Sequence, residues 1–413
     1  MTEFLNLQSL EQVRSRLLEG THLLQAAERL ATPMALGRVT SSAVLASAPM
    51  PSFARSEVDG YAVRARDTYG ASAALPAYLR LIGEVPMGSP APAAVALGQA
   101  AEIHTGGQIP EGSDAVVMLE DTQISRDQEI EILKPVSFGE NVLRVGEDVQ
   151  PGQVLLPSGQ LLRPQDVGGL MGAGILTVEV VRRPRLALVA TGDEIIPPDR
   201  EPSVGQVRDV NSYVLQAMVK ESGGDPVGYG IVPDEYQVLK LLCQQALMEC
   251  DGLVISAGSS VSARDMTAGV IAEISRPGII AHGIALKPGK PTLVALHEGK
   301  PILGLPGNPV SAAVVARLLL IPAMSRQLGR SDLPGRPTQR LRITRNLDSQ
   351  AGREDFVPCR VVQRGAEEWA DPVFGKSNLI FTLVRANGLL VIPADANGVA
   401  QGDWVEFLPF EGP

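Results

Sequence analysis

Apolar and polar positions alternate most regularly between residues 184 and 327. Short, near-continuous apolar runs in this stretch are typical of buried parallel strands, and the longer runs between them have the spacing of amphipathic helices. Strands are expected at 185–191, 227–232, 252–256 and 301–305, and helices at about 210–222, at 235–248, from about 265, and at 310–320. Strands that alternate with helices predict a doubly wound α/β sheet.

The stretch before residue 51 also has apolar residues at helical spacing. Leu10, Val13 and Leu17 mark one face, and Leu23 and Leu24 mark another. This pattern predicts helical structure on both sides of residue 20.

The remaining stretches have sequence patterns typical of β structure. Residues 51–145 place short β-branched runs between Gly, Pro and Asp, which predicts a small β domain. Residues 146–183 mix strands with one short helix, for which Pro164 suits the first turn, and Gly172 and Gly174 suit the end. Residues 329–413 combine β character with hairpin-like turn signals at 386–388 and 397–398, so a small all-β domain is expected.

Composition limits the partners of the chain. A length of 413 residues predicts two to four domains. The net charge of -10 argues against broad nucleic-acid or anionic-membrane binding. The first residues lack a signal-peptide pattern, no uncharged apolar run is long enough for a membrane span, and three cysteines fit a reducing compartment. We therefore expect a cytoplasmic protein without nucleic-acid or membrane partners, which would bind an anion only through a local cationic cluster.

Three loops rich in small residues follow three of the expected strands, at 191–194, 258–262 and 304–311. Ligands of doubly wound sheets bind beyond the carboxyl ends of the strands, so all three loops should lie along one rim. Glycine lets backbone N–H groups approach an oxyanion, and a helix amino terminus adds partial positive charge. Turn formation alone would explain any one loop. Three on one rim favour a phosphate-bearing ligand.

The segment Lys287-Pro288-Gly289-Lys290-Pro291 supplies positive charge. Prolines beside both lysines reduce the entropy lost when the turn is ordered. We interpret the segment as an anion clamp, and a solvated basic turn is the alternative.

Acids beside glycines occur at 56–62, which contains Asp59, and at 146–148, which contains Asp148; Thr105 lies in a third Gly-containing segment. Carboxylates of this kind could reach Mg²⁺ at a phosphate, although each alone is better explained as a turn acid or a helix cap. The residues therefore predict an anion site, phosphate with Mg²⁺, on the rim of the α/β sheet.

Together these segments resemble the molybdopterin molybdenumtransferase family, which includes the E domain of gephyrin. The similarity covers nearly the whole chain. The matching motifs are S-x-x-D-G-Y-A at 56–62, T-G at 105–106, G-E-D at 146–148, T-G-D-E at 191–194, K-P-G-K-P at 287–291 and G-L-P-G-N-P-V-S at 304–311. The last two in this order are specific to the family.

The resemblance implies an elongated homodimer whose subunit has four domains. These would be a discontinuous α+β dimerisation domain (1–50 and 146–183), an inserted β-rich domain (51–145), an α/β molybdopterin-binding domain (184–327) and a β-barrel-like domain (328–413). The implied substrates are adenylylated molybdopterin and molybdate, and the implied products are molybdenum cofactor and AMP, with Mg²⁺ required. Molybdopterin adenylyltransferase and other cofactor-biosynthesis proteins would be partners.

The resemblance also implies roles for individual residues. The catalytic acids would be Asp59 and Asp148, supplied across the dimer, and Glu194, Asp234 and Asp265 of the α/β domain, with Asp59 and Glu194 at the metal. The substrate-binding residues would be Thr105, Gly258, Ser259, Lys287, Lys290, Pro291, Pro306, Asn308, Arg353 and Ser377. Of these, Lys290, Pro291, Arg353 and Ser377 would lie near molybdate.

Other functions for this fold remain open at this point. The loop at 257–263 departs from the family's G-G-V-S-x-G, which leaves a tungstate-preferring paralogue as one alternative. A non-catalytic scaffold and a nucleotide pyrophosphatase are others. Arg353 and Ser377 favour the transferase, because a pyrophosphatase would not need them.

Overall fold

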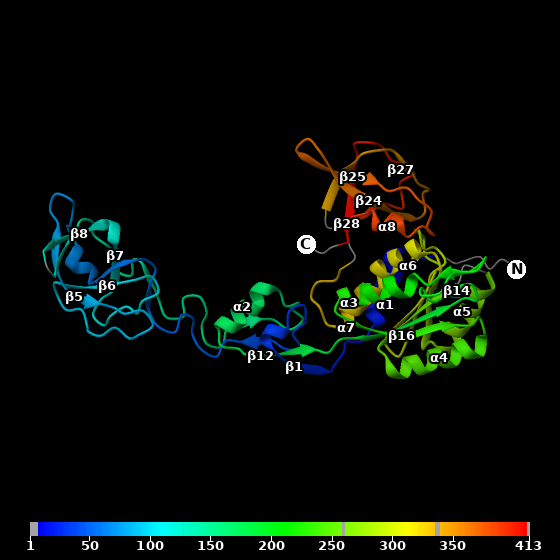
Figure 1. The fold of residues 1–413 in the computed structure, drawn as a ribbon, viewed down its shortest axis with the longest axis horizontal. Helices are drawn as coiled ribbons and strands as arrows, with labels where there is room; N and C mark the ends of the chain where they lie inside the picture. The colour runs from blue at the N-terminus through cyan, green and yellow to red at the C-terminus, as the bar shows by residue number, and fades with distance from the viewer. Residues whose placement is uncertain (1–6, 127, 258–260, 335–338, 411–413) are drawn as a thin grey trace. The chain divides into compact units, whose positions relative to one another are not determined.

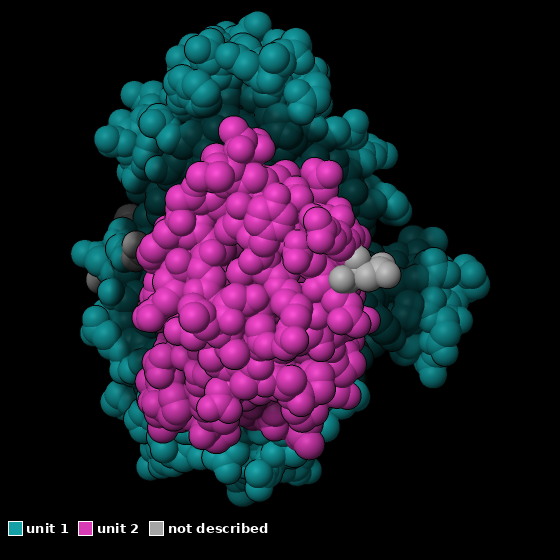
Figure 2. Space-filling model, turned by 90° about the vertical axis from the view of Figure 1, so that its left-hand side faces the viewer, with its two compact units in different colours: residues 1–42, 158–163, 177–413 teal, residues 43–157, 164–176 magenta. Residues whose placement is uncertain are grey.

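The structure is a computed structural model that describes residues 7–126, 128–257, 261–334 and 339–410. It consists of two compact units. Unit 1 comprises Met1–Ser42, Ser158–Arg163 and Thr177–Pro413, and unit 2 comprises Ala43–Pro157 and Pro164–Leu176. Figure 1 shows the elements along the chain, and Figure 2 colours unit 1 teal and unit 2 magenta.

The centre of unit 1 is a six-stranded mixed sheet. Its order is β16 (Asp225–Val232), β13 (Arg185–Thr191), β17 (Gly252–Ala257), β21 (Lys300–Leu305), β20 (Leu293–His297) and β18 (Pro277–His282). The first four strands are parallel, and β20 and β18 continue the sheet antiparallel. The four strands expected from the sequence are confirmed, whereas the antiparallel edge was not anticipated.

Helices cover both faces of this sheet (Figure 1). One core contains Ala187 and Val189 of β13 together with α4 (Tyr236–Glu249) and α5 (Val261–Ile274). The opposite core contains Leu186 and Leu188, because successive strand residues point to opposite faces. The helices of that second face are α1 (Leu10–Gly20), α3 (Asn211–Glu221), α6 (Pro309–Val315), the π-helical turn η4 (Ala316–Leu320) and α7 (Ile321–Gln327).

The run Pro309–Gln327 is apolar enough by composition to span a membrane, but 83% of it is buried inside the fold. It is therefore a core helix of the α/β layer, and its apolar residues pack against the sheet. Among the described residues no other helix passes the same test of length and composition.

The last part of unit 1 is a second six-stranded sheet. Its order is β19 (Leu286–Lys287), β24 (Glu354–Arg364), β25 (Glu367–Pro372), β22 (Gln339–Ile343), β28 (Trp404–Pro409) and β26 (Gly388–Ile392). Pairing of β24 with β26 makes it barrel-like, and β23 (Leu347–Asp348) pairs with β27 (Gly398–Val399). Since β19 belongs to the α/β segment of the chain, its pairing with β24 joins the two sheets.

The expected hairpins of this region are wrong. Asn387 follows the short helix α8 (Phe381–Val384) and leads into β26. A Cβ on Gly388 would lie 2.4 Å from the carbonyl oxygen of Leu408, so this glycine permits close strand approach rather than a turn. Gly398 likewise begins β27, whose partner is β23 and not a strand next to it in sequence.

Unit 2 contains the β domain that the sequence predicted. Its six-stranded sheet has the order β7 (Ala115–Met118), β4 (Gly60–Val63), β6 (Gln99–Ile103), β5 (Ala77–Glu84), β9 (Glu129–Ile132) and β8 (Thr122–Arg126). Two short ladders, β3 (Arg55–Ser56) with β10 (Val142–Leu143) and β2 (Val44–Leu45) with β11 (Val154–Leu156), and helix α2 (Pro164–Gly172) complete the unit. The start predicted for α2 at Pro164 is confirmed, and the helix ends at Gly172, the first of the two glycines expected there.

The helix expected beyond residue 20 is wrong. The Thr21 hydroxyl donates to the Leu17 carbonyl at the end of α1, and Leu24 N–H donates to the Gln327 carbonyl. The chain then enters β1 (Ala27–Ala31), which pairs with β12 (Thr177–Val181). Tertiary hydrogen bonds thus override a helical spacing whose second face is not buried, since Leu23 is 41% exposed.

Candidate functional site

The parallel strands of the α/β sheet end at one rim. Thr191, the last residue of β13, lies opposite both Val232 of β16 and Ala257 of β17, and Ser256 lies opposite Leu305 of β21. The Thr191 hydroxyl donates a hydrogen bond of 2.7 Å to Asp234 Oδ1. Because the strands end in register, the loops that follow them begin side by side, as the sequence predicted.

The predicted acids occupy different positions on this rim. Glu194 is half-buried, and its carbonyl accepts a hydrogen bond of 2.8 Å from Val207 N–H. Val207 belongs to β15 (Val207–Arg208), which pairs with β14 (Ile195–Ile196) in a short ladder. A Cβ on Gly192 would lie 2.9 Å from Glu194 Oε2, so the glycine makes room for this carboxylate. Asp265 is exposed on α5, while Gly258 and Ser259 lie outside the described residues.

A buried asparagine that sequence reasoning missed connects two parts of the rim. Asn211, the first residue of α3, is 7% exposed. Its Nδ2 donates to Ser256 Oγ over 2.7 Å and to the Gly307 carbonyl over 2.9 Å. The available signal was the sequence Asp209-Val210-Asn211-Ser212, in which Asp209 Oδ1 caps the Ser212 N–H at 3.0 Å as helix-starting acids do.

A cavity of about 750 Å³ lies within unit 1, between the turn at 286–291, the amino end of α6 and the last sheet. Six predicted substrate-binding residues line it: Lys287, Lys290, Pro291, Asn308, Arg353 and Ser377. Lys376, Asp348 and Asp355 also line it and were not predicted. Pro306 is buried and is not part of the lining. The lining thus holds four cationic side chains against two carboxylates.

Backbone contacts hold the lysine turn in shape. Gly289 has φ +116°, and a Cβ there would lie 2.5 Å from a Val315 methyl group, so a larger residue is excluded. The Thr292 hydroxyl donates to the Gly289 carbonyl at 2.6 Å, and Ile284 N–H donates to the Lys290 carbonyl at 2.9 Å. Both lysine residues are exposed. The turn therefore presents two ammonium groups from an ordered backbone, which is the geometry an anion clamp needs.

Contacts between distant segments hold the other side of the cavity. Asn308 Nδ2 donates to Ser377 Oγ over 3.0 Å. Arg353 Nε donates to Asp355 Oδ1 over 2.9 Å, and Lys287 Nζ lies 3.6 Å from Asp355 Oδ2. Donors from 287 to 377 are therefore gathered around one space, which can bind a tetrahedral oxyanion by charge-assisted hydrogen bonds.

In unit 2 the structure brings together Asp59 and Thr105. Asp59 Oδ1 accepts hydrogen bonds from the Thr105 N–H at 2.7 Å and the Thr105 hydroxyl at 3.0 Å. These two bonds, the backbone one first, hold the pKa of Asp59 below its usual value, and nearby His104 adds to the effect. A Cβ on Gly60 would lie 1.9 Å from the Val117 carbonyl, which explains the glycine that follows Asp59.

Asp148 lines a cavity of about 630 Å³ in unit 2, separate from the cavity of unit 1. Arg55 and Glu147 line the same space, and Asp148 N–H donates to the Met50 carbonyl at 3.0 Å. Within the described part of the chain, no group of three or more His, Cys, Asp or Glu side chains is arranged to hold a metal ion. The acids therefore offer carboxylates singly or in pairs.

Family models match the chain from end to end. The MoeA N-terminal region (domain I and II) matches residues 8–174, the model described as "Probable molybdopterin binding domain" matches 187–326, and the MoeA C-terminal region (domain IV) matches 340–410. Molybdopterin molybdenumtransferase of Haemophilus influenzae is 30% identical over 97% of this chain and 98% of the relative. The chain belongs to the molybdopterin molybdenumtransferase family. The Nostoc sp. member is 32% identical over 89% of this chain and 85% of the relative.

Solved structures agree with this family assignment. The crystal structure of the molybdopterin biosynthesis moeA protein from Pyrococcus horikoshii OT3 is 30% identical, with a TM-score of 0.87 over 98% of this chain and 100% of that chain. A molybdenum cofactor biosynthesis protein from Pyrococcus furiosus, 21% identical with a TM-score of 0.59 over 97% of this chain and 100% of that chain, supports the fold alone. The family resemblance and the multidomain α/β fold are confirmed, and the chain is a transferase of molybdenum cofactor biosynthesis.

Proposed function

We propose that this family member transfers molybdenum from molybdate to adenylylated molybdopterin and releases AMP. The observation that carries the proposal is the cavity in which Lys287, Lys290 and Arg353 meet Asn308 and Ser377. Molybdate is a tetrahedral dianion, and it must approach a substrate that already carries phosphate charge. Cationic donors fixed around one space lower the repulsion between such groups and orient them for reaction.

Within the proposal, Lys290, Pro291, Arg353 and Ser377 hold molybdate, and Lys287 with Asn308 holds neighbouring oxyanions. The remaining substrate contacts are those of Thr105, Gly258, Ser259 and Pro306, and the acids that act at the phosphoanhydride and its metal are Asp59, Asp148, Glu194, Asp234 and Asp265. The two pterin sulfurs displace an oxo ligand of molybdate, which takes up two protons and leaves as water. A water molecule attacks the anhydride between the pterin phosphate and AMP, so that the pterin keeps its phosphate and AMP leaves. The chain's own residues bind and orient these groups, without a covalent enzyme intermediate.

Magnesium fits the proposal as an ion held largely by the substrate. Mg²⁺ commonly binds through one or two carboxylates together with substrate phosphates and water. Glu194 is half-buried at the rim, and Asp59 has Oδ1 occupied by Thr105, which fixes the carboxylate for a further ligand on Oδ2. Bound there, the ion would neutralise charge that develops on the anhydride.

The homodimer, the four-domain division (1–50 with 146–183, 51–145, 184–327 and 328–413), the cytoplasmic location and the adenylyltransferase partner belong to the same proposal. If Asp59 acts in the site of the other subunit, as the family resemblance implies, inactive Asp59→Ala and Lys290→Ala chains should complement each other. Refolded or co-expressed mixtures should regain activity, because one site of each mixed dimer keeps both residues. Mixtures as inactive as either variant would exclude this arrangement.

The direct test is AMP release by purified protein supplied with adenylylated molybdopterin, Mg²⁺ and molybdate. Release that depends on molybdate supports the transferase. Release without molybdate would indicate a pyrophosphatase, no release would indicate a scaffold, and a clear preference for tungstate would indicate a tungstate enzyme. Lys290→Ala should abolish most of the activity, whereas Lys220→Ala, which removes an exposed lysine of α3 outside the cavity lining, should leave it unchanged.

A further inference from the structure

Asp355 is a buried acid in a cavity whose other features attract anions. The residue is 2% exposed and lies at the start of β24, opposite Lys287 in the register of β19 with β24. Its Oδ1 accepts the 2.9 Å hydrogen bond from Arg353 Nε, and its Oδ2 lies 3.6 Å from Lys287 Nζ. One carboxylate therefore contacts two cations that are distant in sequence, one on β19 and one just before β24.

A carboxylate in this position has two opposite effects on a bound anion. Its negative charge repels the anion, and this effect alone would weaken binding. Its contacts also restrict two long cationic side chains, which would otherwise lose considerable rotamer entropy when an anion binds. Burial without partners would be strongly unfavourable for the carboxylate itself. The folded state therefore favours conformations in which Arg353 and Lys287 remain in contact with Asp355.

The edge of the guanidinium that Asp355 uses decides between these effects. The bond to Asp355 is made by Nε, so both Nη groups of Arg353 lie outside this contact. Parallel N–H donors of this kind suit bidentate recognition of an oxyanion. Lys287 keeps 58% of its side chain exposed, which leaves its ammonium group accessible from the cavity.

We propose that Asp355 is a positioning residue that aims Arg353 and Lys287 at the molybdate of the proposed reaction. The inference rests on the proposed function and adds a residue to which the family resemblance assigned no role. Asp355 touches the two cations and not the anion. Its loss should therefore weaken oxyanion binding even though it makes the cavity more positive.

Asp348 provides a matched control. It lines the same cavity but is exposed, and no hydrogen bond or ion pair of its side chain is seen among the described residues. Asp348→Asn and Asp355→Asn each remove one negative charge from the cavity, so a purely electrostatic effect would move both variants in the same direction. Positioning through Arg353 and Lys287 would separate them.

The experiment measures molybdate binding by calorimetry and molybdate-dependent AMP release for wild type, Asp355→Asn, Asp355→Glu and Asp348→Asn. Asp355→Asn should raise the Kd of molybdate about tenfold, equivalent to about 1.4 kcal/mol. The KM for molybdate should rise while kcat at saturating molybdate stays within about twofold, because uniform binding is lost. Asp348→Asn should bind equally or more tightly, and Asp355→Glu should recover part of the affinity.

Asp355→Asn should fold, because the backbone pairing of β24 with β19 and β26 does not use this side chain. Circular dichroism checks this, and Asp355→Glu carries the test if the amide variant does not fold. Equal or tighter molybdate binding by the folded Asp355 variants, in parallel with Asp348→Asn, would overturn the inference. Failure of the proposed function would look different: wild type would then bind no molybdate, and inorganic phosphate would replace it as the probe for the same comparison.

Discussion

Asn308 and Ser377 are joined by a hydrogen bond of 3.0 Å between Asn308 Nδ2 and Ser377 Oγ, although they lie 69 positions apart in the chain. A second bond of 3.1 Å runs from Val310 N–H to the Ser377 carbonyl. The first residue stands at the N-cap position of α6 in the α/β layer, and the second precedes α8 in the last part of the chain. This contact holds together two walls of the cationic cavity.

Removing either side chain of this pair should loosen the last sheet. A hydrogen bond of this kind contributes about 1 kcal/mol. Both tryptophans of the chain, Trp369 and Trp404, lie in that sheet, so their fluorescence reports on its unfolding. Asn308→Ala and Ser377→Ala should each lower the thermal midpoint, and the double variant should lower it by less than the sum of the two. Fully additive shifts would mean that the two side chains are not coupled.

Arg353→Ala should raise the concentration of molybdate needed for half-maximal AMP release. The guanidinium is one of four cations in the lining, and a charge-assisted hydrogen bond contributes about 1.5–3 kcal/mol. A tenfold or larger increase in the KM for molybdate is therefore expected, with binding of the adenylylated pterin changed little. Arg360→Ala, which removes a cation of β24 outside the lining, is the control. Loss of pterin binding with unchanged molybdate affinity would place Arg353 at the wrong substrate.

Asp59→Ala and Glu194→Ala should reduce turnover strongly and leave the fold nearly intact. Asp59 is exposed and Glu194 is half-buried, so neither carboxylate supports a core. Steady-state AMP release and circular dichroism measure the two effects separately. Full molybdate-dependent activity in either variant would contradict the role at the anhydride and metal proposed for that residue.

Thr105→Val should raise the pKa of Asp59 toward the usual aspartate value of 3.8. The backbone bond from Thr105 remains in this variant, and the hydroxyl bond is lost. Because the folded pKa is depressed, ionised Asp59 favours the folded state above about pH 3.8, and this contribution is lost as the pH falls through the folded pKa. Carboxyl NMR titration measures the shift, with Thr105→Ser as the control that keeps the hydroxyl. An unchanged pKa in Thr105→Val would mean that the hydroxyl does not act on Asp59.

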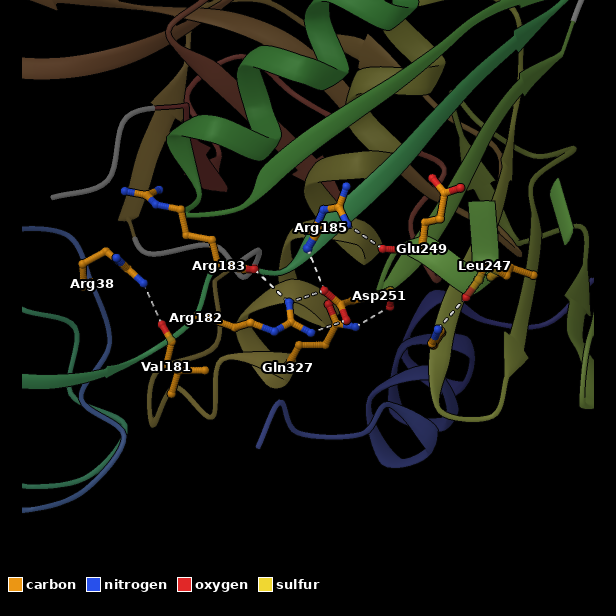
Figure 3. A network of polar contacts seen from close by, with 10 residues as sticks. Arg38, Val181, Arg182, Arg183, Arg185, Leu247, Glu249, Asp251 and Gln327 are labelled. Carbon is orange, nitrogen blue, oxygen red and sulfur yellow. Dashed lines mark hydrogen bonds and ion pairs between the residues drawn. The ribbon is translucent and has the colours of Figure 1, made fainter. Parts of the chain in front are cut away.

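Arg182 and Asp251 form a bidentate ion pair, with bonds of 2.6 and 2.7 Å, that fastens the end of the β12 segment to the α/β layer (Figure 3). Arg185 N–H and Gln327 Nε2 donate to the same aspartate, at 2.8 Å to its carboxylate and 2.6 Å to its carbonyl. Burial by itself would raise the pKa of Asp251, but the bonds from Arg182 and Arg185 hold it below its usual value.

Arg182→Ala should therefore destabilise unit 1 by about 2 kcal/mol, less than for a fully buried pair because Arg182 is partly exposed. Urea unfolding followed by circular dichroism gives the change. The depressed pKa means that the contribution of Asp251 is complete above its unfolded pKa and disappears as the pH falls through the folded one. The stability difference between wild type and Arg182→Ala should thus shrink in acid. A difference that is constant down to the lowest pH would show that the ion pair contributes nothing.

Regular patterns made the central fold predictable. The apolar run at 185–191 could be assigned to a buried strand because nearly all its residues face a core on one side of the sheet or the other. The same holds for β17, and the parallel register then brings their ends to one rim. The antiparallel strands β20 and β18 escaped prediction because they lie on either side of the lysine turn, where proline and glycine obscure the apolar pattern.

The candidate site residues likewise divide into those that the sequence predicted and those that it did not. Lys287 and Lys290 stand out in the sequence as cations within a recognisable motif, and Asp59 as an acid beside a glycine, whereas Arg353 was predicted through the family resemblance. Asp355 and Asn211 do not, because an acid next to Arg353 or an asparagine at a helix start has many ordinary explanations. Their importance follows from burial and from partners that lie elsewhere in the chain.

The sequence by itself determined the alternation of strands and helices, the glycine loops at the strand ends and the kinds of charge available for an anion, because these depend on neighbouring residues and on periodicity. Only the tertiary structure decided that residues near 287, 308, 353 and 377 line one cavity, and that a buried carboxylate pairs with two of its cations. Such contacts depend on how the strands pair across long stretches of chain, as β19 does with β24. Local sequence patterns do not indicate which distant strands will pair.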